Sequence, residues 1–310
     1  MYPLKFQPIY VKTVWGSDKL AKIRGVKEGF GSAWDVSSHK NADNVVINGE
    51  FKGKSLIEML NQYKEDMLGD KDLSKMIRLS YLDASDSLSI QVHPNNEYAR
   101  KYENDEGKVE CWYILRAEPN SKLIAGTTTS SVDTIKKAIE NDNIEEYVNR
   151  IEMEKDDFIL IDSGELHAFG GGMIALEISQ NSDTTYRFYD FHRKDKNGVE
   201  RELHLDKCFD VADFTKKGEK IHIDKKEGTR FNIVDLEEFI VDCLDINGEY
   251  NFVKDDNTFY GLSNVGDSTV KILYDNEVIE INKTESIFVP AKCKSFVMEG
   301  NSRVIITYVK

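Results

Sequence analysis

Cysteine is scarce in this chain, and the thiols stand far apart. Among 310 residues there are four cysteines and no Cys-x-x-Cys pair: Cys111, Cys208, Cys243 and Cys293. A thiolate zinc site or a dithiol redox motif needs closely spaced cysteines. The sequence therefore argues against both classes of site. It predicts reduced, mostly buried thiols, with Cys111 as a packing residue.

Long hydrophobic runs are also missing. No stretch approaches the ~18 apolar residues of a membrane span, and residues 1–5 lack the basic and then apolar pattern of a signal peptide. With 40% hydrophobic and 10% aromatic residues, the composition is that of a soluble globular protein. We expect a cytoplasmic protein that does not contact a membrane.

Positive charge is in deficit. The chain has 41 Lys and Arg against 55 Asp and Glu, which gives a formal net charge of −14. This charge makes binding to nucleic acid unfavourable. An anionic substrate would need a local basic patch, for which Lys108, Arg187 and Arg193 are the candidates. No feature of the sequence fixes the number of subunits.

Two stretches carry side chains that suit a metal ion. Residues 88–93 alternate as in a strand, which places Gln91 and His93 on one face. Residues 109–116 form a second predicted strand, on which Glu110 shares a face with Trp112. Burying a carboxylate on an apolar strand is costly unless a positive charge meets it. A divalent ion between the two strands would supply that charge.

A fourth ligand is expected from residues 156–167, an apolar strand followed by a turn at Gly164 and then His167. Such a turn can aim the imidazole back towards the first three groups. The oxygen and nitrogen set of Gln91, His93, Glu110 and His167 suits one Zn²⁺ per chain, or a similar divalent ion, with a position open for substrate. The absence of thiolate ligands favours a catalytic site over a structural one. We expect the other histidines to be packing or surface residues: His39, His192, His204 and His222.

The chain order indicates two β-rich parts joined near the charged residues 215–230. The first part mixes strands with short helices, predicted at 55–68, 95–103, 131–140 and 144–150. In the second part short apolar strands recur with turns between them, at 231–235, 238–244, 258–263, 269–273, 277–281, 286–290 and 302–308. No histidine follows His222, so the second part cannot repeat the metal site. We expect domains at 1–225, with the metal, and at 226–310, without it.

Several motifs together resemble one family. They are Trp15-Gly16, Ala33-Trp-Asp-Val-Ser37, Gln91-Val-His-Pro-Asn95, Gly107-Lys-Val-Glu-Cys-Trp-Tyr113, Gly164-Glu-Leu-His-Ala168, and the run from Glu177 to Asp190. In this order, from about Trp15 to about Asp206, they resemble the type I mannose-6-phosphate isomerases in their short bacterial form. The metal motif is similar to that of the cupin β-barrels, with Gln91 where many cupins have a histidine.

The resemblance implies a fold and a reaction. The fold would be mostly β, with two cupin-like (jelly-roll) β-barrels and small helical insertions in the first half. The reaction would be the reversible conversion of mannose 6-phosphate to fructose 6-phosphate, by proton transfer through an enediolate. A phosphosugar would be the small-molecule partner, and the metal would act as a Lewis acid.

Several site residues follow from the same resemblance. Arg187 matches the active-site arginine of the family, although a structural ion pair with Glu177 or Asp183 is an alternative reading. Lys108 and Glu177 match positions that line the substrate, and either could be the base that transfers the proton.

Three further residues are assigned to substrate binding, namely Trp15, Asp183 and Arg193. Packing and sugar stacking are equally good readings of Trp15. One position departs from the family: Phe169 stands where longer members often have a tyrosine, so a hydroxyl contact there is absent or comes from another residue.

Two other functions remain open at this point. A cupin oxygenase using Fe(II) could employ the same ligands, but it would have no need of Lys108 and Arg187 to bind phosphate. A non-catalytic sugar-binding module is the second alternative, although such a module has no obvious use for an open metal position.

Overall fold

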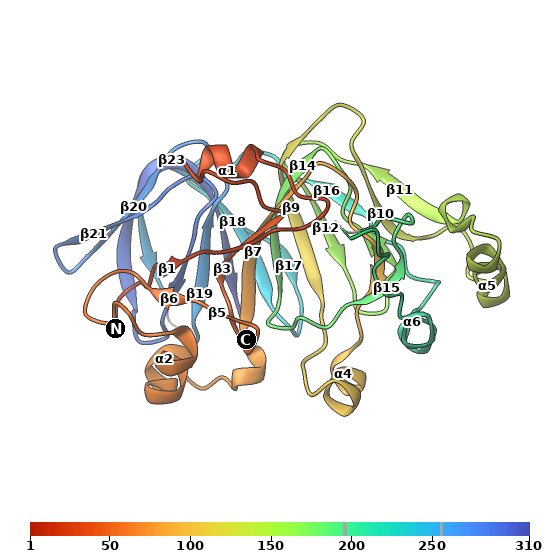
Figure 1. Cartoon of the computed structure of the whole chain (residues 1–310). Helices are drawn as coiled ribbons and strands as arrows, with labels where there is room; N and C mark the ends of the chain where they lie inside the picture. The colour runs from red at the N-terminus through yellow and green to blue at the C-terminus, as the bar shows by residue number, and fades with distance from the viewer. Residues whose placement is uncertain (195–196, 255–256) are drawn as a thin grey trace.

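Antiparallel sheets are the main element of the fold (Figure 1). The computed structural model describes residues 1–194, 197–254 and 257–310. A seven-stranded sheet with the order β16-β12-β9-β14-β7-β3-β2 crosses the first part of the chain. Its strands are β2 (Ile9–Val11), β3 (Ser32–Val36), β7 (Ile77–Ala84), β9 (Glu110–Ala117), β12 (Asp157–Ile161), β14 (Met173–Gln180) and β16 (Lys220–His222).

A five-stranded sheet with the order β11-β10-β13-β8-β15 is built from the same part of the chain. Its strands are β8 (Ile90–Val92), β10 (Lys122–Thr127), β11 (Val148–Glu152), β13 (His167–Ala168) and β15 (Tyr186–Tyr189). A buried apolar cluster contains Trp112 and Ile159 of the larger sheet together with Leu123 and Ala125 of β10. Side chains of the two sheets therefore share one interior.

The second part of the chain forms another seven-stranded sheet. Each of its seven strands overlaps a strand that the sequence predicted. These strands are β17 (Arg230–Asp235), β18 (Ile240–Val253), β19 (Tyr260–Asn264), β20 (Val270–Tyr274), β21 (Glu277–Ile281), β22 (Ser286–Val289) and β23 (Ser295–Tyr308). β18 and β23 are longer than expected, because they pair with each other from Ile240↔Tyr308 to Val253↔Ser295.

The two parts share a core. Leu4 of the N-terminal segment pairs with Phe288 of β22, and both belong to a buried cluster with Leu79 of β7 and Ile305 of β23. Two small pairs of strands complete the β structure: β1 (Phe6–Gln7) with β6 (Val45–Val46), and β4 (Ser38–His39) with β5 (Ala42–Asp43).

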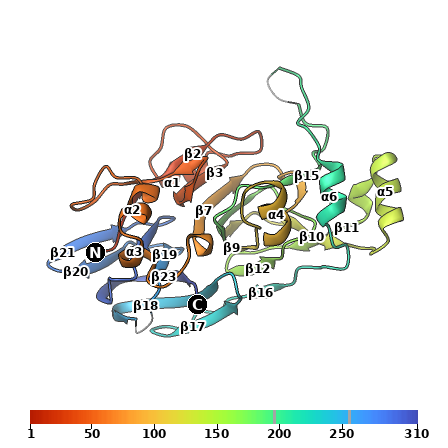
Figure 2. The same ribbon diagram turned by 90° about the horizontal axis from the view of Figure 1, so that it is seen from below.

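The helices are short and lie around the sheets, with α5 and α6 at the end of the molecule far from β20 and β21 (Figure 2). They are α1 (Lys19–Ile23), α2 (Leu56–Gln62), α3 (Lys64–Leu68), α4 (Asn96–Tyr102), α5 (Val132–Glu140) and α6 (Leu205–Val211), with 3₁₀ turns at Leu73–Lys75 and Ile144–Glu146. In the described parts of the chain, no helix is long and apolar enough to cross a membrane.

Two helix predictions need correction. The expected helix at 55–68 is split at Tyr63 into α2 and α3, although its Ser55 capping box with Glu58 forms as the sequence indicates. The expected helix at 144–150 is wrong. Only one 3₁₀ turn forms there, because the chain then becomes β11 and pairs with β10. Pairing with a distant strand outweighs the weak local helical pattern.

Candidate metal centre and active site

The metal ligands expected from the sequence meet between the two sheets of the first part. Glu110 begins β9 of the larger sheet, while Gln91 on β8 and His167 on β13 are direct neighbours in the smaller one. His93 comes directly after β8. His93, Glu110 and His167 have 0% exposure, and their potential ligand atoms lie within 4.8 Å of one another.

The spacing of these atoms suits a metal ion. His93 Nε2 lies 3.6 Å from Glu110 Oε2, and His167 Nε2 lies 3.4 Å from Glu110 Oε1. Two atoms that are each ~2.1 Å from a tetrahedral zinc ion stand roughly 3.4 Å apart. The amide of Gln91 reaches the same place, with its Nε2 3.3 Å from His167 Nε2. A half-turn of that amide would present its oxygen instead.

Both imidazoles are held in the form that binds metal. The Nδ1 of His93 donates to the Thr184 carbonyl at 2.9 Å, and the Nδ1 of His167 donates to the Glu165 carbonyl at 2.8 Å. Each ring therefore turns the lone pair of Nε2 inwards. Burial lowers the pKa of His93 to about 4, so the ring is neutral at physiological pH.

Two acceptor atoms inside this group lack a hydrogen-bond donor among the described residues. His93 Nε2 and Glu110 Oε1 are buried and make no hydrogen bond with any described residue. Leaving a buried acceptor unsatisfied costs about 1–3 kcal/mol, and more for a charged group. A divalent cation would satisfy both atoms at once, so the residues present fit a metal ion.

Lys108 and Glu177 lie beside the candidate metal ligands. Lys108 Nζ is 2.6 Å from Glu110 Oε2 and 3.4 Å from Glu177 Oε1. Glu177 also accepts hydrogen bonds from Ser80 Oγ at 3.3 Å and from Trp112 Nε1 at 3.4 Å. Burial alone would lower the pKa of Lys108, but Glu110 and Glu177 outweigh it and raise that pKa above its usual value. Lys108 is therefore cationic.

Arg187 on β15 stands directly opposite Gln91 in the smaller sheet. Its guanidinium donates to the Glu202 carbonyl at 2.7 Å, while its buried Nε makes no hydrogen bond with any described residue. Burial lowers its pKa, and the nearby cation of Arg201 lowers it further. The structural ion pair with Glu177 or Asp183 is not found among the described residues.

Arg193 is part of a basic group beside Arg187. Asp190 accepts from Arg193 at 2.5 Å and from Arg201 at 2.6 and 2.7 Å. Two guanidinium groups thus share one carboxylate, and the positive charges of both lower the pKa of the nearby Arg187. Positive charge is therefore in local excess here, in a protein that is acidic overall.

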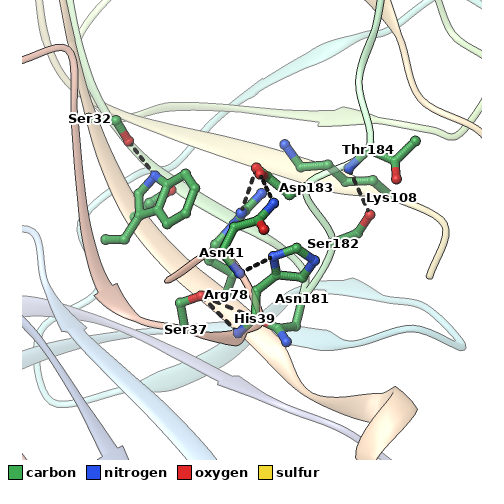
Figure 3. Close-up of polar contacts among 12 residues, drawn as sticks. Ser32, Ser37, His39, Asn41, Arg78, Lys108, Asn181, Ser182, Asp183 and Thr184 are labelled. Atoms are coloured by element: carbon green, nitrogen blue, oxygen red, sulfur yellow. Dashed lines mark hydrogen bonds and ion pairs between the residues drawn. The ribbon is translucent and has the colours of Figure 1, made fainter. Parts of the chain in front are cut away.

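Trp15 and Asp183 lie in different surroundings. Trp15 is 7% exposed and packs in the apolar cluster with Trp112 and Phe169. Phe169 itself lies edge-on to Trp112, with ring centroids 5.2 Å apart. Asp183 is partly exposed. It lies 3.4 Å from Arg78 and accepts from Asn41 at 3.1 Å (Figure 3).

Arg78 and Thr184 were missed by the sequence interpretation. Arg78 is 3% exposed on β7 and lies 4.5 Å from the ring centroid of Trp34. A charged residue within the apolar run 76–82 was the available signal, as it was for Glu110. Thr184 acts through its backbone carbonyl, which no side-chain pattern reveals.

A second group with metal-ligand atoms, Glu154, Asp157 and His222, lies near the surface. Asp157 already accepts from Lys220 at 2.8 Å and from His222 at 2.8 Å. The ammonium of Lys220 thus occupies the position that a metal ion would take beside Asp157. The expectation that His222 is a surface residue is in keeping with this arrangement.

Comparison with known proteins identifies the family. The family described as phosphomannose isomerase type I, catalytic domain, matches residues 4–110. Mannose-6-phosphate isomerase ManA of Bacillus subtilis is 32% identical over 314 residues, which cover 99% of each chain. The chain belongs to the type I phosphomannose isomerases.

Two further comparisons support this family assignment. The mannose-6-phosphate isomerase of Streptococcus mutans is 38% identical over 212 residues, 67% of each chain. The crystal structure of the mannose 6-phosphate isomerase from Bacillus subtilis superposes with a TM-score of 0.90 at 31% identity and covers 100% of both chains. The resemblance inferred from the sequence motifs, and with it the expected isomerase function, is confirmed.

Proposed function

We propose that this type I phosphomannose isomerase interconverts mannose 6-phosphate and fructose 6-phosphate with one zinc ion held by Gln91, His93, Glu110 and His167. The observation that carries the proposal is the buried set of inward-facing candidate ligand atoms. Two of these atoms, His93 Nε2 and Glu110 Oε1, make no hydrogen bond within the part of the chain that the structure describes. When bound there, zinc would polarise sugar oxygens as a Lewis acid.

Glu177 is the group proposed to move the proton between C1 and C2 of the sugar. It is a nearly buried carboxylate next to the ligands and not one of them. Lys108 is cationic, because Glu110 and Glu177 raise its pKa, so it lacks the lone pair that a base needs. We assign Lys108 to the stabilisation of negative charge that develops on the sugar oxygens.

Arg187 and Arg193 are proposed to bind the anionic parts of the substrate. Arg187 stands opposite Gln91, so its guanidinium is placed to meet an oxyanion near the ligand group. Arg193 belongs to the basic group around Asp190. Asp183 is proposed to contact substrate hydroxyls from the partly exposed cluster with Arg78. Substrate stacking on Trp15 stays a prediction, and the burial of this side chain supports the packing alternative.

The finer features of the fold are inferred from the same family. We propose that the paired sheets of the first part form a cupin-like barrel carrying the metal, and that the sheet of the second part forms another without it. The proposed domains are 1–225 and 226–310. Free, buried thiols at all four cysteines support the proposal of a reducing, cytoplasmic location.

A coupled assay tests this function. Purified protein is given mannose 6-phosphate, and fructose 6-phosphate is measured before chelation, after chelation and after zinc is added back. We expect turnover that is lost on chelation and restored by zinc. A fully metallated protein without turnover refutes the isomerase reaction. Oxygen consumption with Fe(II) would then support the cupin oxygenase.

A further inference from the structure

Asp105 lies in the loop between α4 and β9, and its side chain is 9% exposed. Its Oδ2 accepts from Thr184 Oγ1 at 2.8 Å, from the Asp183 backbone N–H at 3.1 Å and from Ser182 Oγ at 3.2 Å. Its Oδ1 accepts from the Glu106 backbone N–H at 2.9 Å and lies 3.5 Å from His39 Nε2. One carboxylate thus fixes the segment 182–184 by contacts to each of its residues.

That segment supports the metal centre directly. The Thr184 carbonyl accepts the Nδ1 proton of His93 at 2.9 Å and so sets which ring nitrogen faces the other ligands. Three residues later the same segment reaches Arg187 on β15. On its other side, Asp105 is followed by Lys108 and Glu110. It therefore joins the two stretches of chain that enter the site from opposite sheets.

We propose that Asp105 is a positioning residue of the metal centre, which holds the Thr184 carbonyl in place and thereby orients His93. The inference rests on the metal site of the proposed function. Partners that orient a metal-binding histidine through its second nitrogen typically change metal affinity or activity by about 10–100-fold when they are removed.

The chemistry of the contacts explains why a carboxylate is needed. The hydroxyl of Thr184 and the N–H groups of Asp183 and Glu106 donate to Asp105. The Ser182 hydroxyl shares its proton between Asp105 at 3.2 Å and the Glu106 carbonyl at 2.8 Å. An asparagine has the same shape, but its NH₂ would face some of these donors and could not accept from them. The segment 182–184 would have to move, and the Thr184 carbonyl would move with it.

His39 adds a further link to this network. Its Nδ1 accepts from the Asn41 backbone N–H at 3.2 Å (Figure 3), and Asn181 Oδ1 accepts from the Ser38 N–H at 3.3 Å. The small sheet of β4 and β5 is thereby tied to the residues that precede Asp183. His39 is buried, as expected of a packing residue, and its Nε2 also faces Asp105.

The test compares Asp105→Asn with a control variant at a carboxylate of similar burial. Asp245 on β18 has a side chain that is 3% exposed and accepts from Arg303 at 2.7 and 3.0 Å and from the Lys226 N–H at 2.7 Å. Asp245→Asn removes a comparable carboxylate from the other sheet. Zinc affinity of each full-length variant is measured by competition with a chromogenic chelator, and folding by circular dichroism.

We expect Asp105→Asn to weaken zinc binding by about 10–100-fold and Asp245→Asn to leave it within about twofold of wild type. Thr184→Val, which removes one donor to Asp105 without changing the backbone, should weaken zinc binding in the same direction but less. If Asp105→Asn does not fold, the zinc affinity of Thr184→Val tests the inference instead. The visible spectrum of Co²⁺-substituted Asp105→Asn should also change, because the ligand geometry relaxes.

Zinc affinity and Co²⁺ spectra equal to wild type in the folded Asp105 and Thr184 variants would overturn the inference. A loss of affinity in Asp245→Asn as large as that in Asp105→Asn would also overturn it, because general destabilisation would then explain both. If wild-type protein bound no zinc, the metal site itself would be refuted, and the assignment of Asp105 would fail with it.

Discussion

Lys108 and Glu177 face each other beside the candidate metal ligands, with Lys108 Nζ 3.4 Å from Glu177 Oε1. Both residues were candidates for the base, and the sequence did not choose between them. Glu177 is one of the two carboxylates that raise the pKa of Lys108, so Lys108 is the cation of the pair and Glu177 is the proposed base. Variants of the two residues can test these two roles separately.

Glu177→Gln should lower kcat by about 10²–10⁴, the usual contribution of a positioned acid or base. Zinc content should stay at the wild-type value, because Glu177 is not a proposed ligand. The variant should also stop exchanging the C2 hydrogen of mannose 6-phosphate with D₂O, which NMR can follow. Glu154→Gln, at a glutamate with a side chain 72% exposed, is the control. Undiminished exchange in Glu177→Gln would remove this residue from the role of base.

Lys108→Met should lower turnover and yet tighten zinc binding. The ammonium lies 2.6 Å from Glu110 Oε2 and therefore opposes a second cation on the same carboxylate. Removing the ammonium should raise zinc affinity by roughly tenfold, because two like charges at close range repel each other. Chelator competition measures the affinity, and the coupled assay measures kcat. Weaker zinc binding in this variant would show that Lys108 supports the metal site instead of opposing it.

Arg187→Ala should reduce kcat/KM by at least about 10²-fold, the effect of removing one group that stabilises an oxyanion. Zinc content should be unchanged, since Arg187 neighbours Gln91 but is not a proposed ligand. Arg150→Ala is the matched control, because Arg150 is also a strand arginine but pairs with Glu145 at the surface. Activity that persists in Arg187→Ala would show that its assigned role is wrong.

The free energy of unfolding should depend on Asp245 in acid. Burial alone would raise the pKa of Asp245, but its hydrogen bonds with Arg303 outweigh this and lower it below 3.8. A lowered folded-state pKa gives stability that is present above the unfolded value and is lost as the pH falls through the folded one. The difference in urea midpoint between wild type and Asp245→Asn should therefore be constant above about pH 5 and shrink below about pH 4. A difference that grew in acid would contradict this ion pair.

The sequence predicted which side chains gather at the candidate metal site, because their placement depends on local rules. Strand parity places Gln91 with His93, and burying Glu110 is costly unless a positive charge meets it. The strands of the second part could also be predicted from the sequence, because short apolar segments separated by turns are typical of β-strands.

Other features depend on distant contacts and were not predictable. The role of Asp105 requires the segment 182–184 to fold against the loop after α4. β11 was misread as helix because only its pairing with β10 makes it a strand. The charge of Lys108 depends on Glu177, which comes from another strand of the sheet.

The most direct test of the account is a zinc titration of the metal-free protein, with bound zinc and isomerase activity measured at each step. Ligand atoms from His93, Glu110 and His167 gather at one buried place. We therefore predict that turnover of mannose 6-phosphate rises linearly with bound zinc and stops rising at one ion per chain. Full activity in the metal-free protein, or activity that does not follow bound zinc, would contradict the account.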